Sequence, residues 1–171
     1  MTSYVALLRG VNLMGSTTLR MSDLKAIAER LGLERPRTFI ASGNLLFTSE
    51  KSELSIKTAL ETALKKHMAR DVGVMVRTAG EIEQVVADNP FADQPGNRVV
   101  AIFLDSAPGK DSLDHAKGVA DERMALGKRE IYVHYPGGQG RSKLRIPAAV
   151  AGTARNMNSV AKIAALAKEA T

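Results

Sequence analysis

Residues 37–48 read RTFIASGNLLFT, and this stretch decides the fold of the first half of the chain. Residues 37–41 and 45–48 are runs that favour β-structure. Ser42-Gly43-Asn44 between them is a turn-forming triplet. The stretch therefore predicts two antiparallel strands joined by a tight turn.

The segments on either side of this hairpin place it inside a larger unit. An apolar run over residues 4–8 predicts a buried strand, and apolar residues at helical spacing follow it up to Gly32. After the hairpin, Ser52 is placed to cap a second helix, and residues 71–77 predict a strand. The order strand-helix-strand-strand-helix-strand is that of the ferredoxin-like split β-α-β unit, in which both helices pack on one face of an antiparallel sheet.

Residues 78–171 repeat this order, except that the pattern offers no closing strand. Thr78-x-x-Glu81 is a capping box that opens a helix. Later segments predict a strand over residues 98–104, a short helix over residues 112–118, a hairpin over residues 122–135 and a final helix over residues 159–169. We therefore expect an α+β protein of two ferredoxin-like subdomains, residues 1–77 and 78–171, each with an antiparallel sheet and helices packed on one face.

The composition excludes several classes of protein. The chain has 171 residues and no Cys, so disulfides, thiol catalysis and thiolate metal sites are excluded. Its three His residues are scattered at no ligand spacing, and we expect neither a metal nor a cofactor. No apolar run approaches the roughly 20 residues of a membrane span, and residues 1–10 lack the layout of a signal peptide. These features predict a cytoplasmic protein with no membrane partner.

Positive charge is concentrated in the last third of the chain. Residues 1–122 contain 15 Lys and Arg against 16 Asp and Glu, whereas residues 123–171 contain 9 against 2. No acidic side chain occurs between Ile131 and Lys168. Such a segment attracts phosphate or carboxylate groups, although solvated Lys and Arg on a final helix would give the same pattern.

Four short polar segments stand at predicted strand ends or helix starts. They are Arg9-Gly10-Val11-Asn12, Ser42-Gly43-Asn44, residues 137–143 and Thr153-Ala154-Arg155-Asn156. The first strand and the hairpin are neighbours in a ferredoxin-like sheet, so we expect Arg9 and Asn12 to approach Ser42 and Asn44. The alternative is that these side chains only bond the local backbone in tight turns.

The glycine-rich residues 137–140 lead directly into Arg141, Ser142 and Lys143. Successive amides around Gly138 and Gly140 could form an anion-binding nest, to which the basic side chains add charge-assisted hydrogen bonds. Arg155 and Asn156, just before the final helix, could join the same anion or merely cap that helix.

Residues 10–17 have the glycine spacing and the terminal Thr of a phosphate-binding P-loop. Ser16 stands where the essential Lys belongs, and residues 19–21 separate the loop from its helix. Both departures argue against a nucleoside triphosphatase.

The four polar segments, together with residues 132–136 and Asn158, resemble those of the bacterial family called domain of unknown function 1697. The resemblance covers nearly the whole chain and implies an α+β fold with two ferredoxin-like subdomains. It implies no activity, cofactor or partner. The chain departs from the family pattern at Met157, where Trp is frequent, and at Leu13-Met14-Gly15, where a second glycine is common.

Three functions are open at this point. The first is a site for a small phosphorylated or otherwise anionic ligand in a cleft between the subdomains, built from Arg9, Asn12, Ser42, Asn44, Gly138, Gly140, Ser142, Lys143, Arg155 and Asn156. The second is a nucleic-acid-binding module, against which the 4% aromatic content argues. The third is a structural or interaction protein. None of the four segments contains a carboxylate or His for acid–base chemistry, so no catalytic residue is predicted.

Overall fold

The computed structural model describes residues 1–13 and 18–169 of the chain. The chain forms two compact units, the first made of Met1–Ile82 with Ile163–Thr171 and the second of Glu83–Lys162. Each unit holds one four-stranded antiparallel sheet. The predicted α+β fold class is confirmed.

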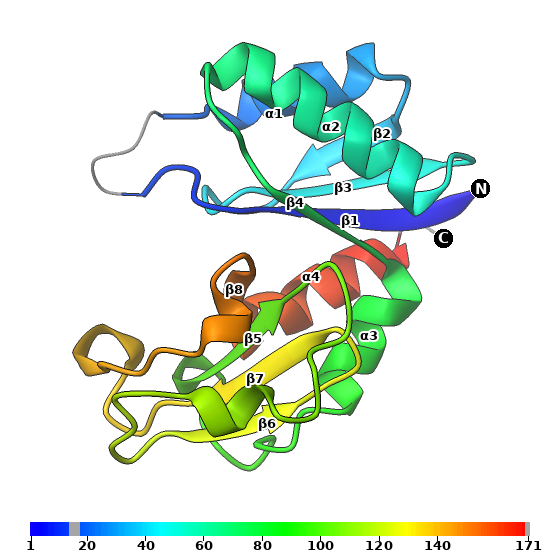
Figure 1. The fold of residues 1–171 in the computed structure, drawn as a ribbon. Coiled ribbons are helices and arrows are strands. Elements are labelled where there is room, and N and C mark those ends of the chain that lie inside the picture. The colour runs from blue at the N-terminus through cyan, green and yellow to red at the C-terminus, as the bar shows by residue number, and fades with distance from the viewer. Residues whose placement is uncertain (14–17, 170–171) are drawn as a thin grey trace. The chain divides into compact units, whose positions relative to one another are not determined.

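The first unit has the predicted split β-α-β order. Its elements are β1 (Thr2–Leu8), α1 (Met21–Arg30), β2 (Glu34–Thr38), β3 (Asn44–Ser49), α2 (Glu53–Met68) and β4 (Val74–Thr78). The strands lie in the order β2-β3-β1-β4, and Figure 1 shows α1 and α2 over one face of this sheet. A hairpin is present, since Arg37 pairs with Leu46 and Thr38 with Leu45. The predicted bounds of its first strand, residues 37–41, are wrong, because β2 ends at Thr38 and Asn44 already belongs to β3. The residues of β2 are polar, so pairing with β3 and not an apolar pattern sets where this strand lies.

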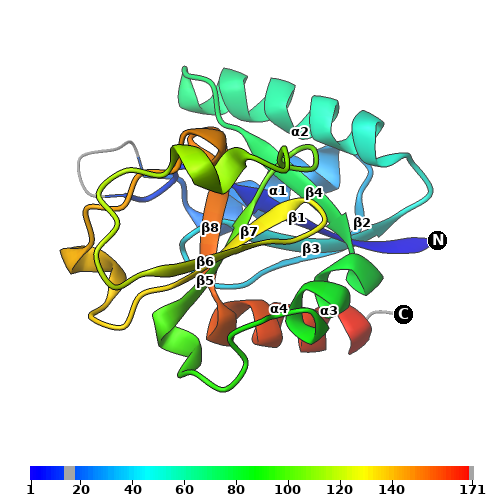
Figure 2. The same cartoon turned by 60° about the horizontal axis from the view of Figure 1, so that its bottom comes forward.

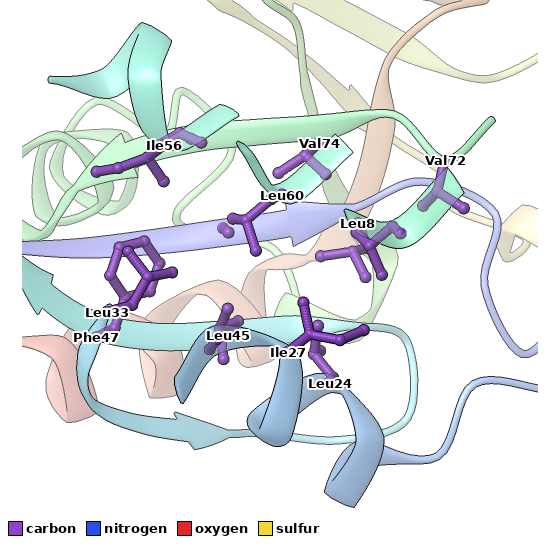
Figure 3. Close-up of a cluster of buried hydrophobic side chains, with 14 of the residues drawn as sticks. Leu8, Leu24, Ile27, Leu33, Leu45, Phe47, Ile56, Leu60, Val72 and Val74 are labelled. Carbon is purple, nitrogen blue, oxygen red and sulfur yellow. The ribbon is translucent and has the colours of Figure 1, made fainter. Parts of the chain in front are cut away.

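The core of the first unit lies between the sheet and its two helices. Leu8 of β1 and Leu45 of β3 lie in a cluster with Ile27 of α1 and Leu60 of α2 (Figure 3). Leu60 is fully buried, and burying a side chain of this size contributes about 1.5–3 kcal/mol. The apolar periodicity of the sequence thus corresponds to the packed faces of the helices.

Two predicted helix caps are present. The Ser52 hydroxyl accepts a hydrogen bond from the backbone N–H of Ser55 at 3.2 Å. The Thr78 hydroxyl accepts one from the N–H of Glu81 at 3.1 Å, while the Glu81 carboxylate accepts one from the N–H of Thr78 at 2.8 Å. This reciprocal pair opens α3 (Ala79–Ala87).

The second unit contains β5 (Val99–Phe103), β6 (Arg123–Leu126), β7 (Glu130–His134), β8 (Thr153–Asn156) and the start of α4 (Met157–Glu169). Its strand order, β6-β7-β5-β8, repeats that of the first sheet. The expectation that this half lacks a closing strand is wrong, because β8 pairs antiparallel with β5. β8 is only four residues long, and three of them are polar. Its buried positions are Thr153 and Arg155, so the alternation of burial produces no apolar pattern in the sequence.

The connections that hold α1 and α2 in the first unit have no α-helical counterpart in the second. Between β5 and β6 lies the short 3-10 helix Ser112–His115, and between β7 and β8 lie Gln139–Arg141 and Pro147–Ala149. An apolar cluster that includes Val100, Ile131 and Val133 belongs to the sheet face on this side. Such short helical turns cover less of a sheet than an α-helix does, and hollows remain beside them.

The strand register separates the two faces of the second sheet. Ala101 is opposite both Tyr132 and Arg155, and successive side chains of a strand alternate between faces. The Tyr132 hydroxyl donates a hydrogen bond to the Val85 carbonyl of α3 at 2.7 Å. Tyr132 and Arg155 therefore lie on the face toward α3, whereas Val133 lies on the other.

Candidate functional site

A pocket of about 310 Å³ lies at one end of the second sheet. It is lined by residues drawn from 118–122, before β6, and from 135–143, after β7. These segments meet because Arg123 at the start of β6 pairs with His134 at the end of β7. Figures 1 and 2 show both segments extending beyond the same end of the strands. We call this hollow the Ser142 pocket.

Glu122 brings a carboxylate into the Ser142 pocket. The Ser142 hydroxyl donates a hydrogen bond to one carboxylate oxygen of Glu122, and the backbone N–H of Ala120 donates one to the other at 2.7 Å. The Ser142 oxygen in turn accepts a hydrogen bond from the N–H of Leu144 at 3.1 Å. The hydrogen bond from Ser142, helped by the one from Ala120, lowers the pKa of Glu122 below its ordinary value. The carboxylate is therefore ionised and fixed in place near neutral pH.

Two cations face the same pocket. Arg141 and Lys143 line it, both are exposed, and neither forms an ion pair with any residue in the described ranges. Gly118 has a φ of +69° and packs against the backbone of Lys143, where a side chain would collide with the Lys143 carbonyl. This close approach holds the Lys143 segment against the segment before β6.

The glycine-rich loop adds a third cation beside the pocket. Gly138 has a φ of +90°, and a Cβ at this position would lie 2.6 Å from Nη1 of Arg98. The guanidinium thus occupies the space that a side chain would fill. Gly140 belongs to the same loop but does not line the pocket.

Tyr135 forms part of the pocket wall and is 7% exposed. Burial, with a further contribution from the nearby Glu122 carboxylate, raises the pKa of Tyr135, so the hydroxyl stays protonated near neutral pH. Among the residues that the structure describes, this hydroxyl has no hydrogen-bond partner. It is a hydrogen-bond donor available to a molecule in the pocket.

The four predicted site residues of the first unit, Arg9, Asn12, Ser42 and Asn44, lie at one end of its sheet. They come from two loops that are far apart in the sequence. Asn12 donates hydrogen bonds from Nδ2 to the carbonyls of Leu19 (2.8 Å) and Ala41 (2.7 Å), and its Oδ1 accepts one from the N–H of Leu19 (2.7 Å). The bond to Ala41 joins the loop after β1 to the turn before β3. The two loops therefore converge as expected.

The side-chain amides of Asn12 and Asn44 form most of these hydrogen bonds with backbone groups of the protein. Asn44 is fully buried and donates to the Phe39 carbonyl (2.8 Å) and to the Ser42 hydroxyl (3.1 Å). Arg9 has an exposed side chain, and its backbone N–H bonds the Gly73 carbonyl at 2.9 Å. These hydrogen bonds fix the conformation of the two turns. Residues 14–17 of the P-loop-like segment lie outside the described residues.

Arg155 and Asn156 do not line the Ser142 pocket. Arg155 lies on the α3 side of the sheet, where its Nη1 donates to the Thr153 hydroxyl at 2.7 Å. Burial lowers the pKa of Arg155 to about 10, which leaves it charged near neutral pH. The Asn156 Oδ1 accepts a hydrogen bond from the N–H of Ser159 at 2.9 Å and so caps α4.

Within the described ranges, no group of three or more His, Asp or Glu residues could hold a metal ion. In the same residues, every helix is too short or too polar to cross a membrane.

The comparisons with known proteins identify the family. A family model described as "Protein of unknown function (DUF1697)" matches residues 1–132. The chain belongs to this family. The family resemblance inferred from the polar segments is thus confirmed. No curated protein matches the chain.

A solved structure shares the fold of this DUF1697 chain. It is that of a conserved bacterial protein from Streptococcus pneumoniae, with 24% sequence identity and a TM-score of 0.79, and the match covers 97% of this chain and 98% of that one. The fold therefore extends over both units, whereas the DUF1697 match ends inside β7. Glu122 lies within the matched residues, and Ser142 and Lys143 lie after them.

The sequence reasoning missed Glu122 and Tyr135 as pocket residues of this DUF1697 protein. The signal was present, because the predicted hairpin over residues 122–135 has these two residues at its ends. Antiparallel pairing brings the ends of a hairpin together. Arg98 left no such signal, since its place beside Gly138 depends on how the loop folds back.

Proposed function

We propose that the second unit binds a small ligand in the Ser142 pocket, and that this ligand carries a phosphate or carboxylate beside a hydroxyl or amine. The proposal rests above all on one observation. Two cations without an ion-pair partner among the described residues, Arg141 and Lys143, share a pocket with the fixed carboxylate of Glu122.

The cations support an anionic group. Arg and Lys form charge-assisted hydrogen bonds with phosphate and carboxylate oxygens. The pocket volume of about 310 Å³ suits a small molecule.

The Glu122 carboxylate supports a hydrogen-bond donor on the same ligand. Its oxygens accept hydrogen bonds from the Ser142 hydroxyl and the Ala120 N–H, and a carboxylate has room for about four in all. A bare anion would be repelled by this carboxylate and by Asp121 in the same wall. A hydroxyl or amine next to the anionic group would turn that repulsion into a hydrogen bond.

Calorimetric titration with glycerol 3-phosphate, inorganic phosphate and glycerol tests the proposal. Glycerol 3-phosphate is expected to bind more tightly than either of the others. Lys143→Ala should weaken its binding at least about tenfold, because a hydrogen bond to a charged group contributes about 1.5–3 kcal/mol.

Lys128→Ala is the matched control, since Lys128 is an exposed cation in the turn at the far end of the β6–β7 hairpin. It should leave the affinity unchanged. Failure of all three probes to bind at millimolar concentration, or an equal loss in the two variants, would contradict the proposal.

A further inference from the structure

A second hollow adjoins the Ser142 pocket within the same unit. Its volume is about 420 Å³, and its walls are mostly apolar, with Ile102 of β5 and side chains from residues 144–150. Because it lies on the sheet face that lacks a crossover α-helix, it is open beside the apolar cluster of this unit. We call it the Ile146 hollow.

Tyr135 lines both the Ser142 pocket and the Ile146 hollow. Two chain segments also pass from one to the other: Gly118 lines the pocket while Lys117 lines the hollow, and Lys143 lines the pocket while Leu144 lines the hollow. Lys117 and Arg145 hold these segments together through two backbone hydrogen bonds of 2.8 Å. The two hollows therefore share a wall whose two segments are hydrogen-bonded to each other.

The character of the wall changes across this boundary. On the side of the pocket stand the carboxylate of Glu122 and the cations Arg141 and Lys143. On the side of the hollow most side chains are apolar, with Ile146, Pro147 and the 69% exposed Val150 among them, although Lys117 and Arg145 also line it. Together with Ile102 and Leu144, these apolar side chains make a continuous apolar wall that an apolar group of a ligand could cover.

We propose that the Ser142 pocket and the Ile146 hollow form one site for an amphiphilic phosphate or carboxylate, with the charged head in the pocket and a short alkyl chain in the hollow. This inference rests on the proposed function, because it assigns the head group to the same pocket. The Tyr135 hydroxyl, which lacks a partner among the described residues and lies at the junction, donates a hydrogen bond to the ligand where head and chain meet.

The alkyl chain supplies affinity through burial. Each methylene group that leaves water contributes about 0.8 kcal/mol, close to a fourfold gain in affinity. The hollow is open, so only part of the chain is covered. A six-carbon chain is expected to raise the affinity at least about tenfold.

The experiment compares glycerol 3-phosphate with its 1-O-butyl and 1-O-hexyl ethers by calorimetric titration of the full chain. These probes share the phosphate and the hydroxyl on carbon 2, and the ethers carry the alkyl chain in place of the proton on oxygen 1, so the comparison of butyl with hexyl changes only the length of the chain. The affinity is expected to rise from glycerol 3-phosphate to the butyl and then the hexyl ether. Hexanol alone should bind much more weakly than the hexyl ether.

Three variants locate the two halves of the ligand. Val150→Asp, at an exposed position, should remove most of the gain from the chain and leave glycerol 3-phosphate unaffected. Lys143→Ala should weaken all three probes by the same factor. Tyr135→Phe keeps the ring and removes the donor, and should weaken all three roughly fivefold, as expected for one hydrogen bond.

The outcomes separate the two proposals. If glycerol 3-phosphate binds and the ethers bind no more tightly, the amphiphilic site is wrong while the head-group pocket stands. A gain with chain length that Val150→Asp leaves intact also contradicts the amphiphilic site. If no probe binds, or if Lys143→Ala changes nothing, the proposed function itself fails.

Discussion

The Ser142 hydroxyl donates a hydrogen bond to the Glu122 carboxylate at the open end of the β6–β7 hairpin, where Arg123 pairs with His134. This bond joins the segment before β6 to the segment after β7, and the Leu144 N–H donates a further hydrogen bond to the Ser142 oxygen. The two walls of the Ser142 pocket therefore depend on each other.

Ser142→Ala is expected to raise the pKa of Glu122 toward its ordinary value of 4.5, because the largest cause of the lowering is removed. A carboxyl whose pKa is lower in the folded than in the unfolded state stabilises the fold above the unfolded pKa. That contribution is lost as the pH falls through the folded pKa. The variant should therefore lose stability near neutral pH but little below the folded pKa.

Titration of the Glu122 side-chain carbon by NMR measures the pKa directly. Ser106→Ala, at an exposed serine in the same unit, is the control and should leave the titration unchanged. An unaltered Glu122 pKa in Ser142→Ala would show that the hydrogen bond does not form in solution.

Asn12→Gly is expected to destabilise the first unit by roughly 2–3 kcal/mol, since it removes three side-chain hydrogen bonds that contribute about 1 kcal/mol each. The backbone at Asn12 has a positive φ of +56°, which glycine adopts without strain. The loss of stability therefore reports the missing hydrogen bonds and not backbone strain. Amide hydrogen exchange of β1 and β3 measures the loss.

Asn12→Ala adds the cost of a left-handed backbone for alanine, about 1 kcal/mol, and should be the less stable of the two variants. Neither variant should change binding in the Ser142 pocket, which belongs to the other unit. Weaker ligand binding with unchanged exchange would instead assign Asn12 to a ligand site.

Gly43→Ala is expected to destabilise the first unit by more than Gly10→Ala. Both glycines have positive φ, +92° and +68°. A Cβ on Gly43 would lie 2.7 Å from Cγ2 of Val11 and 2.9 Å from Cβ of Leu8, whereas a Cβ on Gly10 has no neighbour within 4 Å. Overpacking of this kind adds about 1–3 kcal/mol to the backbone strain. Amide hydrogen exchange of β1 and β3 measures the loss of stability. Equal exchange rates in Gly43→Ala and Gly10→Ala would contradict the close packing of the turn.

Oligonucleotides are expected to bind weakly. Of the six cations in the acid-free stretch, Arg155 is buried, and Arg141 and Lys143 face a pocket too small for a duplex. The other three are Arg145, Lys162 and Lys168, so a plot of log affinity against log salt should have a slope no steeper than about −3, as for three phosphate contacts. Micromolar affinity with a slope near −4, which indicates about four contacts, would favour the nucleic-acid-binding reading.

Most of the fold could be predicted because the helices of the first unit and its strands β1, β3 and β4 carry apolar patterns. The bounds of β2 could not, because its residues are polar and its place is set by pairing with β3. Gly43 does have the positive φ expected of a turn residue, whereas Asn44 belongs to β3. β8 escaped prediction because its residues, Thr153 to Asn156, are set by pairing with β5 and not by their own preferences.

The candidate site was predictable only in part. Ser142 and Lys143 could be chosen because a basic loop after a strand is exposed and polar. Asn12 and Arg155 have the same chemistry in the sequence, yet their side chains bond the backbone or neighbouring groups of the fold. One sequence does not reveal which polar side chains are already satisfied by the protein.

The missing crossover helices also affect how the two halves of the chain fold. In the second sheet, β5 pairs with β7 and β8 across shorter stretches of chain than those that separate β1 from β3 and β4 in the first sheet. Folding slows as the average sequence separation of contacting residues grows. The first unit gains local contacts from α1 and α2, whereas the second unit has less chain to close before its strands can pair. The unit that carries the pocket can therefore assemble its sheet without waiting for crossover helices to form.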